Sequence, residues 1–154
     1  MRKLYFTIIL LLVSTCFCAC WAQDKEFIDY QISSAGVGTQ GTFLVNVTIT
    51  TKKKDFEERL LSYAAVHGVL FRGCDAKIRP LAGSPMAEQQ HADFFKDFFD
   101  NGMYVNYVSI VPSSKSQMKS GKTYKTTATV QVMKDMLRKD LENAKVLKSL
   151  TTGF

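Results

Sequence analysis

The chain has 154 residues, of which 46% are hydrophobic and 22% are charged, and its formal net charge is +6 at pH 7. This length is typical of one domain, and the hydrophobic fraction is too high for a chain that is disordered throughout. Nine glycines and three prolines also exclude collagen-like and low-complexity classes. The composition therefore predicts a folded domain, and it points to no particular chemistry.

The start of the chain has the three parts of a secretory signal peptide. Two basic residues are followed by an apolar run over 4–13, and small residues then lead to Cys20-Trp21-Ala22. The apolar run is about half of the ~20 residues that cross a bilayer as a helix. We therefore predict that 1–22 is a signal peptide removed on export to the periplasm or the extracellular space, and that 23–154 is a single domain.

The cysteines leave a second route to the envelope open. Bacterial lipoproteins are cleaved just before a cysteine that then carries lipid, and Cys16 and Cys20 each stand in an imperfect version of that site. Lipid on either residue would hold the protein on the outer membrane without a spanning helix. Cleavage after Ala22 would leave one thiol, Cys74, which excludes an intrachain disulfide. Burial as a small hydrophobic residue is the favoured interpretation of Cys74, and pairing with another chain is the alternative.

Alternation of apolar and polar residues predicts several strands. The clearest runs cover 43–49 and 123–133, where β-branched residues recur at every second position. Further strands are expected over 27–32 and 103–111, and a short one over 69–71. The polar stretch 113–122 is interpreted as an exposed loop or hairpin connection.

Helical spacing predicts three helices. One begins at Asp55 and runs toward Gly68, a second covers 87–101, and a third covers 134–146. The second carries Phe94, Phe95, Phe98 and Phe99 on one wide face, which is typical of a core contact. The order β-β-α-(β)-α-β-β-α therefore predicts an α+β fold, with a mixed or antiparallel sheet and about three helices packed on one face.

The glycines of Gly36-Val37-Gly38-Thr39-Gln40-Gly41 match the dinucleotide-binding pattern G-x-G-x-x-G. That pattern needs a helix after its last glycine, so that the helix N-terminus meets the pyrophosphate. Here a strand follows instead. We interpret the segment as a glycine hinge or β-bulge between strands, and we expect no cofactor.

Two histidines and one mature cysteine are the candidates for catalysis or metal binding. His67 and Cys74 could serve a small hydrolase, and His67, Cys74, Asp75, His91 and Asp93 are the pool of metal ligands. No pair has a spacing that presets a metal site, and no nucleophile-elbow sequence occurs. We expect no enzyme activity and no metal, and we interpret His67 as a partly buried, hydrogen-bonded helix residue.

Lysines gather in two segments that would suit an anionic partner. We predict a binding surface for envelope proteins or for an anionic glycan or lipid, and no nucleic acid, because the chain is expected to be exported. The alternative is that these lysines only keep exposed loops soluble. The predicted residues are Lys52, Lys53, Lys54, Lys115, Lys119, Lys122, Tyr124 and Lys125.

Two stretches carry a resemblance. Residues 64–73 (AAVHGVLFRG) and 124–146, together with Gly38-Thr39-Gln40-Gly41, resemble a family of uncharacterised secreted α+β proteins of gut Gram-negative bacteria. The strand-then-helix ending is more remotely similar to the N-terminal domain of flagellar assembly protein T and related small envelope lipoproteins. The resemblance implies a non-enzymatic envelope domain with an interaction or assembly role, and it implies no catalytic residues. Membrane attachment is expected only with lipid at Cys16 or Cys20, and the oligomeric state is left open.

Overall fold

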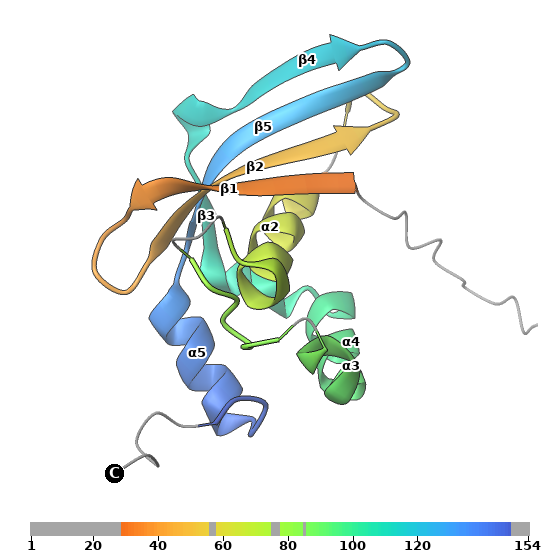
Figure 1. Ribbon diagram of the computed structural model, residues 1–154. Helices are drawn as coiled ribbons and strands as arrows, with labels where there is room; N and C mark the ends of the chain where they lie inside the picture. The colour runs from red at the N-terminus through yellow and green to blue at the C-terminus, as the bar shows by residue number, and fades with distance from the viewer. Residues whose placement is uncertain (1–28, 56–57, 75–77, 85, 149–154) are drawn as a thin grey trace, which may run out of the picture.

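The computed structural model describes residues 29–55, 58–74, 78–84 and 86–148 (Figure 1). The predicted signal peptide lies outside this part of the chain. The elements in chain order are β1 (Asp29–Val37), β2 (Phe43–Thr51), α2 (Glu58–His67), the π-helical turn η1 (Gly68–Arg72), α3 (Ala87–Gln90), α4 (Ala92–Asp100), the 3-10 turn η2 (Met103–Tyr107), β3 (Val108–Ile110), the 3-10 turn η3 (Pro112–Ser114), β4 (Ser116–Ser120), β5 (Thr123–Val132) and α5 (Lys134–Asn143).

The strands form one five-stranded sheet, in which all the described pairs are antiparallel. Its order is β1-β2-β5-β3, and β4 lies beside the other half of the long strand β5. The helices all lie on one side of this sheet (Figure 1). The α+β fold predicted from the sequence is therefore confirmed, and the sheet is antiparallel rather than mixed.

Alternation along the two central strands builds the core. On the helix side of the sheet, Val45, Val47 and Ile49 of β2 are fully buried, as are Ala128 and Val130 of β5. The residues between them face the opposite side, where polar groups pair across the strands. Thr48 and Thr127 are hydrogen-bonded through their hydroxyls at 2.9 Å. One face of the sheet therefore carries the core, and the other is a polar surface.

Helix α2 packs its small and aliphatic residues against the sheet and then widens into the π-helical turn η1. Leu61, Ala64, Ala65 and Val66 are fully buried. The predicted strand over 69–71 is wrong, because this segment is a π-helical turn whose last bond runs from the amide of Gly73 to the carbonyl of Gly68 at 2.8 Å. Its apolar run is buried on all sides, and such a run does not distinguish a strand from a helical turn.

The predicted aromatic helix is present, but it is broken into α3 and α4. His91 interrupts it with φ −121° and ψ 40°, which is not helical. Phe95, Phe98 and Phe99 are buried, and Phe94 is partly buried against them. The aromatic face is thus part of the core, as expected.

The segment 103–111 contains less strand than its pattern predicts. Residues Met103–Tyr107 form the 3-10 turn, and β3 has three residues. Tyr104 and Tyr107 are both buried, and positions three apart share a side in a 3-10 helix. The expectation of a full strand is therefore wrong, because two tyrosines that must both reach the core are three residues apart.

The polar stretch 113–122 holds a strand that the sequence did not reveal. All five residues of β4 are exposed, and they pair with β5 from Ser116 opposite Thr127 to Ser120 opposite Thr123. An exposed edge strand has no buried face, so hydrophobic alternation cannot mark it. The segment is exposed, as expected, but it contains a strand of the β4–β5 hairpin where only a connection was expected.

The glycine-rich segment connects β1 to β2. Their register shifts between Ser34 and Gly36, which is the geometry of a β-bulge, and a turn closed by the Thr42 amide on the Thr39 carbonyl (3.0 Å) follows. Strand β2 begins directly after it, so no helix N-terminus is available for a phosphate. The hinge or bulge interpretation is confirmed.

Candidate functional site

The two lysine segments meet at one end of the sheet. In the antiparallel register, Thr51 of β2, Tyr124 of β5 and Lys119 of β4 stand side by side. The segment 52–54 follows β2 at this level, and Lys122 lies in the turn between β4 and β5 (Figure 1). We call this surface the lysine-rich end, and its members are Lys52, Lys53, Lys54, Lys119, Lys122 and Lys125.

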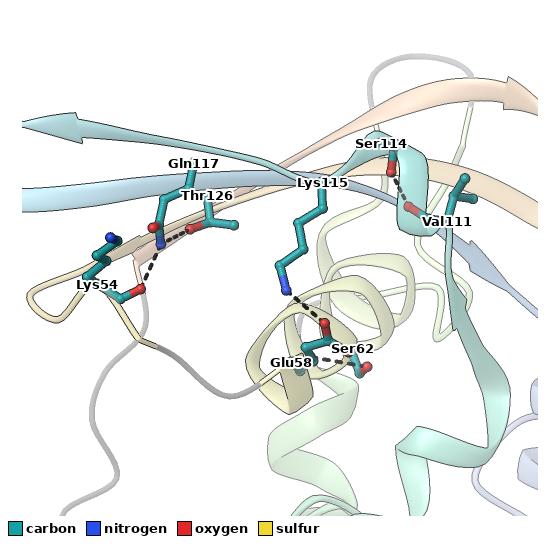
Figure 2. Close-up of polar contacts among 8 residues, drawn as sticks. All are labelled: Lys54, Glu58, Ser62, Val111, Ser114, Lys115, Gln117 and Thr126. Carbon is teal, nitrogen blue, oxygen red and sulfur yellow. Dashed lines mark hydrogen bonds and ion pairs between the residues drawn. The ribbon is translucent and has the colours of Figure 1, made fainter.

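Side-chain hydrogen bonds to main-chain carbonyls hold the lysine segment 52–54 in place, and its lysine side chains are exposed. The side-chain amide of Gln117 donates to the carbonyl of Lys54 at 2.9 Å and to the hydroxyl of Thr126 at 3.0 Å (Figure 2). The Thr51 hydroxyl donates to the carbonyl of Lys53 at 2.9 Å. Residues 52–54 therefore need no lysine side chain to hold their place, so the charges are available to a partner.

Lys115 is placed apart from this surface. Its Nζ lies 2.7 Å from Oε1 of Glu58, so it bridges the sheet edge to the start of α2 (Figure 2). An ion pair of this kind offsets the lysine charge. Lys115 is therefore better described as a link between sheet and helix, whereas Tyr124 is half-buried within the lysine-rich end.

The balance of charge at the lysine-rich end is positive. All six of its lysines are exposed. Asp29, which stands opposite Thr50, and Asp55, which follows the lysine segment, reduce this charge without cancelling it. Met118, opposite Lys125 on the outer face, is 70% exposed and adds an apolar group.

His67 lies at the centre of a second cluster, between β1, α2 and α3. The Tyr30 hydroxyl is 2.5 Å from Nδ1 of His67, and Oε2 of Glu88 is 3.3 Å from Nε2. The imidazole also stacks on Tyr63, with ring centroids 5.3 Å apart, and meets the edge of Phe71 at 5.0 Å. The ring is thus held by polar contacts at both nitrogens and by aromatic rings on its faces.

The state of Tyr30 decides which tautomer of His67 fits this cluster. Burial raises the pKa of the Tyr30 phenol above its usual range, and the Arg72 guanidinium, 4.1 Å from the ring centroid, opposes this only in part. The phenol therefore keeps its proton, and it can donate a hydrogen bond to Nδ1 when that nitrogen carries no proton. A neutral imidazole then carries its proton on Nε2, where Glu88 can accept it.

Cys74 and His67 are the two residues on which a small hydrolase would depend. The nitrogens of His67 face Tyr30 and Glu88, and Cys74 is fully buried. The Cys74 main chain forms a two-way bridge with Ile78, at 2.8 and 3.1 Å. A catalytic thiol needs access to its substrate, and the fully buried Cys74 has none in this structure. The burial expected for Cys74 is confirmed.

Within the described residues, no group of three or more His, Cys, Asp or Glu side chains is arranged to hold a metal ion. In the same part of the chain, no helix has the length and apolar character to cross a bilayer. Asp75, one of the predicted ligands, lies outside the described residues.

The fold and these two clusters define a small α+β domain with one polar sheet face and a lysine-rich end. No family model, curated protein or solved structure matches the chain. The resemblance to secreted proteins of gut Gram-negative bacteria, and the remote one to flagellar assembly protein T, therefore stay predictions.

Proposed function

We propose that the protein is an exported, non-enzymatic domain of the cell envelope that binds an anionic partner through its lysine-rich end. One observation carries this proposal: residues 52–54 and 119–125 are distant in sequence, yet the register of three strands brings their lysines together. Clustered lysines with little opposing charge attract phosphate and carboxylate groups at a polymer or membrane surface. The shared chemistry is that of a polyanion, supplied either by a glycan or by lipid headgroups.

Binding to a polyanion is tested with one lysine removed from each segment. We expect the K54A/K122A variant to bind phosphatidylglycerol vesicles or a polyuronate glycan about tenfold more weakly, since one lysine near an anionic surface contributes up to about 1 kcal/mol. Affinity should also fall as salt is added, because exposed charges are screened. Co-sedimentation with vesicles and calorimetry with the glycan distinguish the two sources.

The matched control is R79A/K139A, which removes two exposed cations outside the lysine-rich end. It lowers the net charge equally, so it should bind like the wild type. If both double variants bind the polyanion equally weakly, the affinity depends on net charge alone and not on the lysine-rich end. An affinity that salt does not change, or no binding to either polyanion, would contradict the proposal.

Export is tested separately by the intact mass of the protein purified from its native host. We expect the mass of a chain that begins at Gln23, since Cys20-Trp21-Ala22 fits a cleavage site. A diacylated chain that begins at Cys16 or Cys20 would show the lipid-anchored alternative. The mass of the uncut chain would contradict export by signal-peptide cleavage.

A further inference from the structure

An open surface groove of about 680 Å³, called this cavity below, lies between the loop before α3 and the end of α5. Its size is within the range of small-molecule sites, roughly 300–1,000 Å³. The apolar part of its lining includes Leu81, Ala82, Val146 and Leu147. The amides of Leu81 and Ala82 donate to the carbonyls of Val69 and Leu70, each at 3.0 Å, so this wall is tied to the core of the fold.

The polar part of the lining is positively charged. It includes Arg138, Lys145 and Lys148, and among the described lining residues Glu142 supplies the one carboxylate. Glu142 already accepts a hydrogen bond from Nε of Arg138 at 2.8 Å. The rim therefore keeps a positive charge beside an apolar wall, which is the complement of a molecule with an apolar chain and an anionic head.

Lys145, at this rim, has an unfavourable backbone conformation. Its φ is 59°, and in the described part of the chain it is the one residue other than glycine with a positive φ. Helix α5 ends here with bonds from the Val146 amide to the Leu141 carbonyl (2.9 Å) and from the Lys145 amide to the Glu142 carbonyl (3.0 Å). This is a Schellman motif, in which glycine is the usual residue at the left-handed position. A lysine there is strained, and such strain is common where a side chain serves a ligand.

We propose that this cavity binds an amphiphilic anion, a saturated chain that carries a carboxylate. The chain would lie against the apolar wall, and the carboxylate would meet the ammonium groups of Lys145 and Lys148. This site is remote in sequence from the lysine-rich end, and neither proposal depends on the other.

The probe for this site is decanoate, titrated by calorimetry below its micellar concentration. We expect saturable binding at one site, at least tenfold weaker binding of hexanoate, which buries less chain, and weaker binding of decyltrimethylammonium, which has the opposite charge. The K145G/K148A variant should bind decanoate about three- to tenfold more weakly. K145G alone should raise the Tm by about 3 °C, because glycine relieves the strained position.

Two controls locate the site. R79A/K139A should bind decanoate like the wild type, and so should K54A/K122A, which alters only the lysine-rich end. The proposal is overturned if decanoate does not bind, if decyltrimethylammonium binds as tightly, or if K145G/K148A leaves the affinity unchanged. Loss of decanoate binding in K54A/K122A would also overturn it, since the ligand would then occupy the lysine-rich end.

Discussion

Replacement of Phe95 by alanine is expected to lower the free energy of unfolding by about 3–5 kcal/mol, as for other large aromatic residues in a closed core. Phe95 is 1% exposed, and it meets Phe71 edge-on at 4.9 Å and Phe94 edge-on at 5.2 Å between ring centroids. It also stacks on Phe99 at 6.4 Å. Because this ring joins α4 to the turn after α2, its loss leaves a cavity that the neighbours cannot fill without moving the helix.

The matched control is Phe94→Ala, which removes the same side chain from the adjacent position of α4. Phe94 is only partly buried, so we expect a loss of about 1–2 kcal/mol, in proportion to the area it buries. Urea denaturation followed by circular dichroism measures both variants, and the slope with denaturant shows whether the transition stays two-state. Equal losses for the two variants would contradict the deeper burial of Phe95.

The predictable part of the fold is the part in which one face is buried. Strand β2 alternates between buried and partly exposed side chains from Val45 to Ile49, and β5 does so from Thr126 to Val132, so the period of two stands out in the sequence. The aromatic face of α4 is equally clear, although its break at His91 is not. His91 is followed by an ordinary helix sequence, and only the tertiary packing explains why the helix restarts there.

The parts that sequence reasoning missed have either no buried face or no exposed one. Strand β4 is exposed along its whole length, and η1 is buried except at Arg72. Neither case produces a contrast between apolar and polar positions, which is what a periodic pattern measures. The prediction fails for a different reason at the short turn η2, since Tyr104 and Tyr107 would face opposite sides of a strand and share one side of the 3-10 turn.

Each candidate site also has a part that the sequence predicts and a part that depends on the fold. The lysines of the two segments could be found in the sequence, because clusters of charge are local, but their meeting depends on the register of β2, β5 and β4. Of the residues that make up these two clusters, the sequence marks the lysines, Tyr124 and His67 as candidates. The partners of His67 are far along the chain, and Tyr30 and Glu88 carry no local signal that marks them as its hydrogen-bonding groups.

The cluster around His67 leads to the second large effect, a loss of about 3 kcal/mol in the free energy of unfolding for His67→Ala. The imidazole is 14% exposed and contacts the rings of Tyr63, Phe71 and Phe99, at 5.3, 5.0 and 5.7 Å between centroids. Its removal takes away these contacts, and it also leaves the buried Tyr30 hydroxyl without its acceptor on the ring. An unsatisfied buried hydroxyl costs more than the hydrogen bond itself contributes.

Two further variants separate the contribution of the hydrogen bond to this loss of unfolding free energy from the contribution of packing. Tyr30→Phe keeps the ring and removes only the hydroxyl, so it should cost about 1–2 kcal/mol, because Nδ1 of His67 then lacks that donor. His91→Ala removes the chain's other histidine, which stands at the helix break, and is expected to cost less than about 1 kcal/mol. Thermal and urea unfolding at pH 7 measure all three. A loss below 1 kcal/mol for His67→Ala would show that the cluster does not hold β1 and α2 together. The burial of this histidine among aromatic rings would then have no structural reason. A catalytic or binding role for His67 would in that case need direct tests.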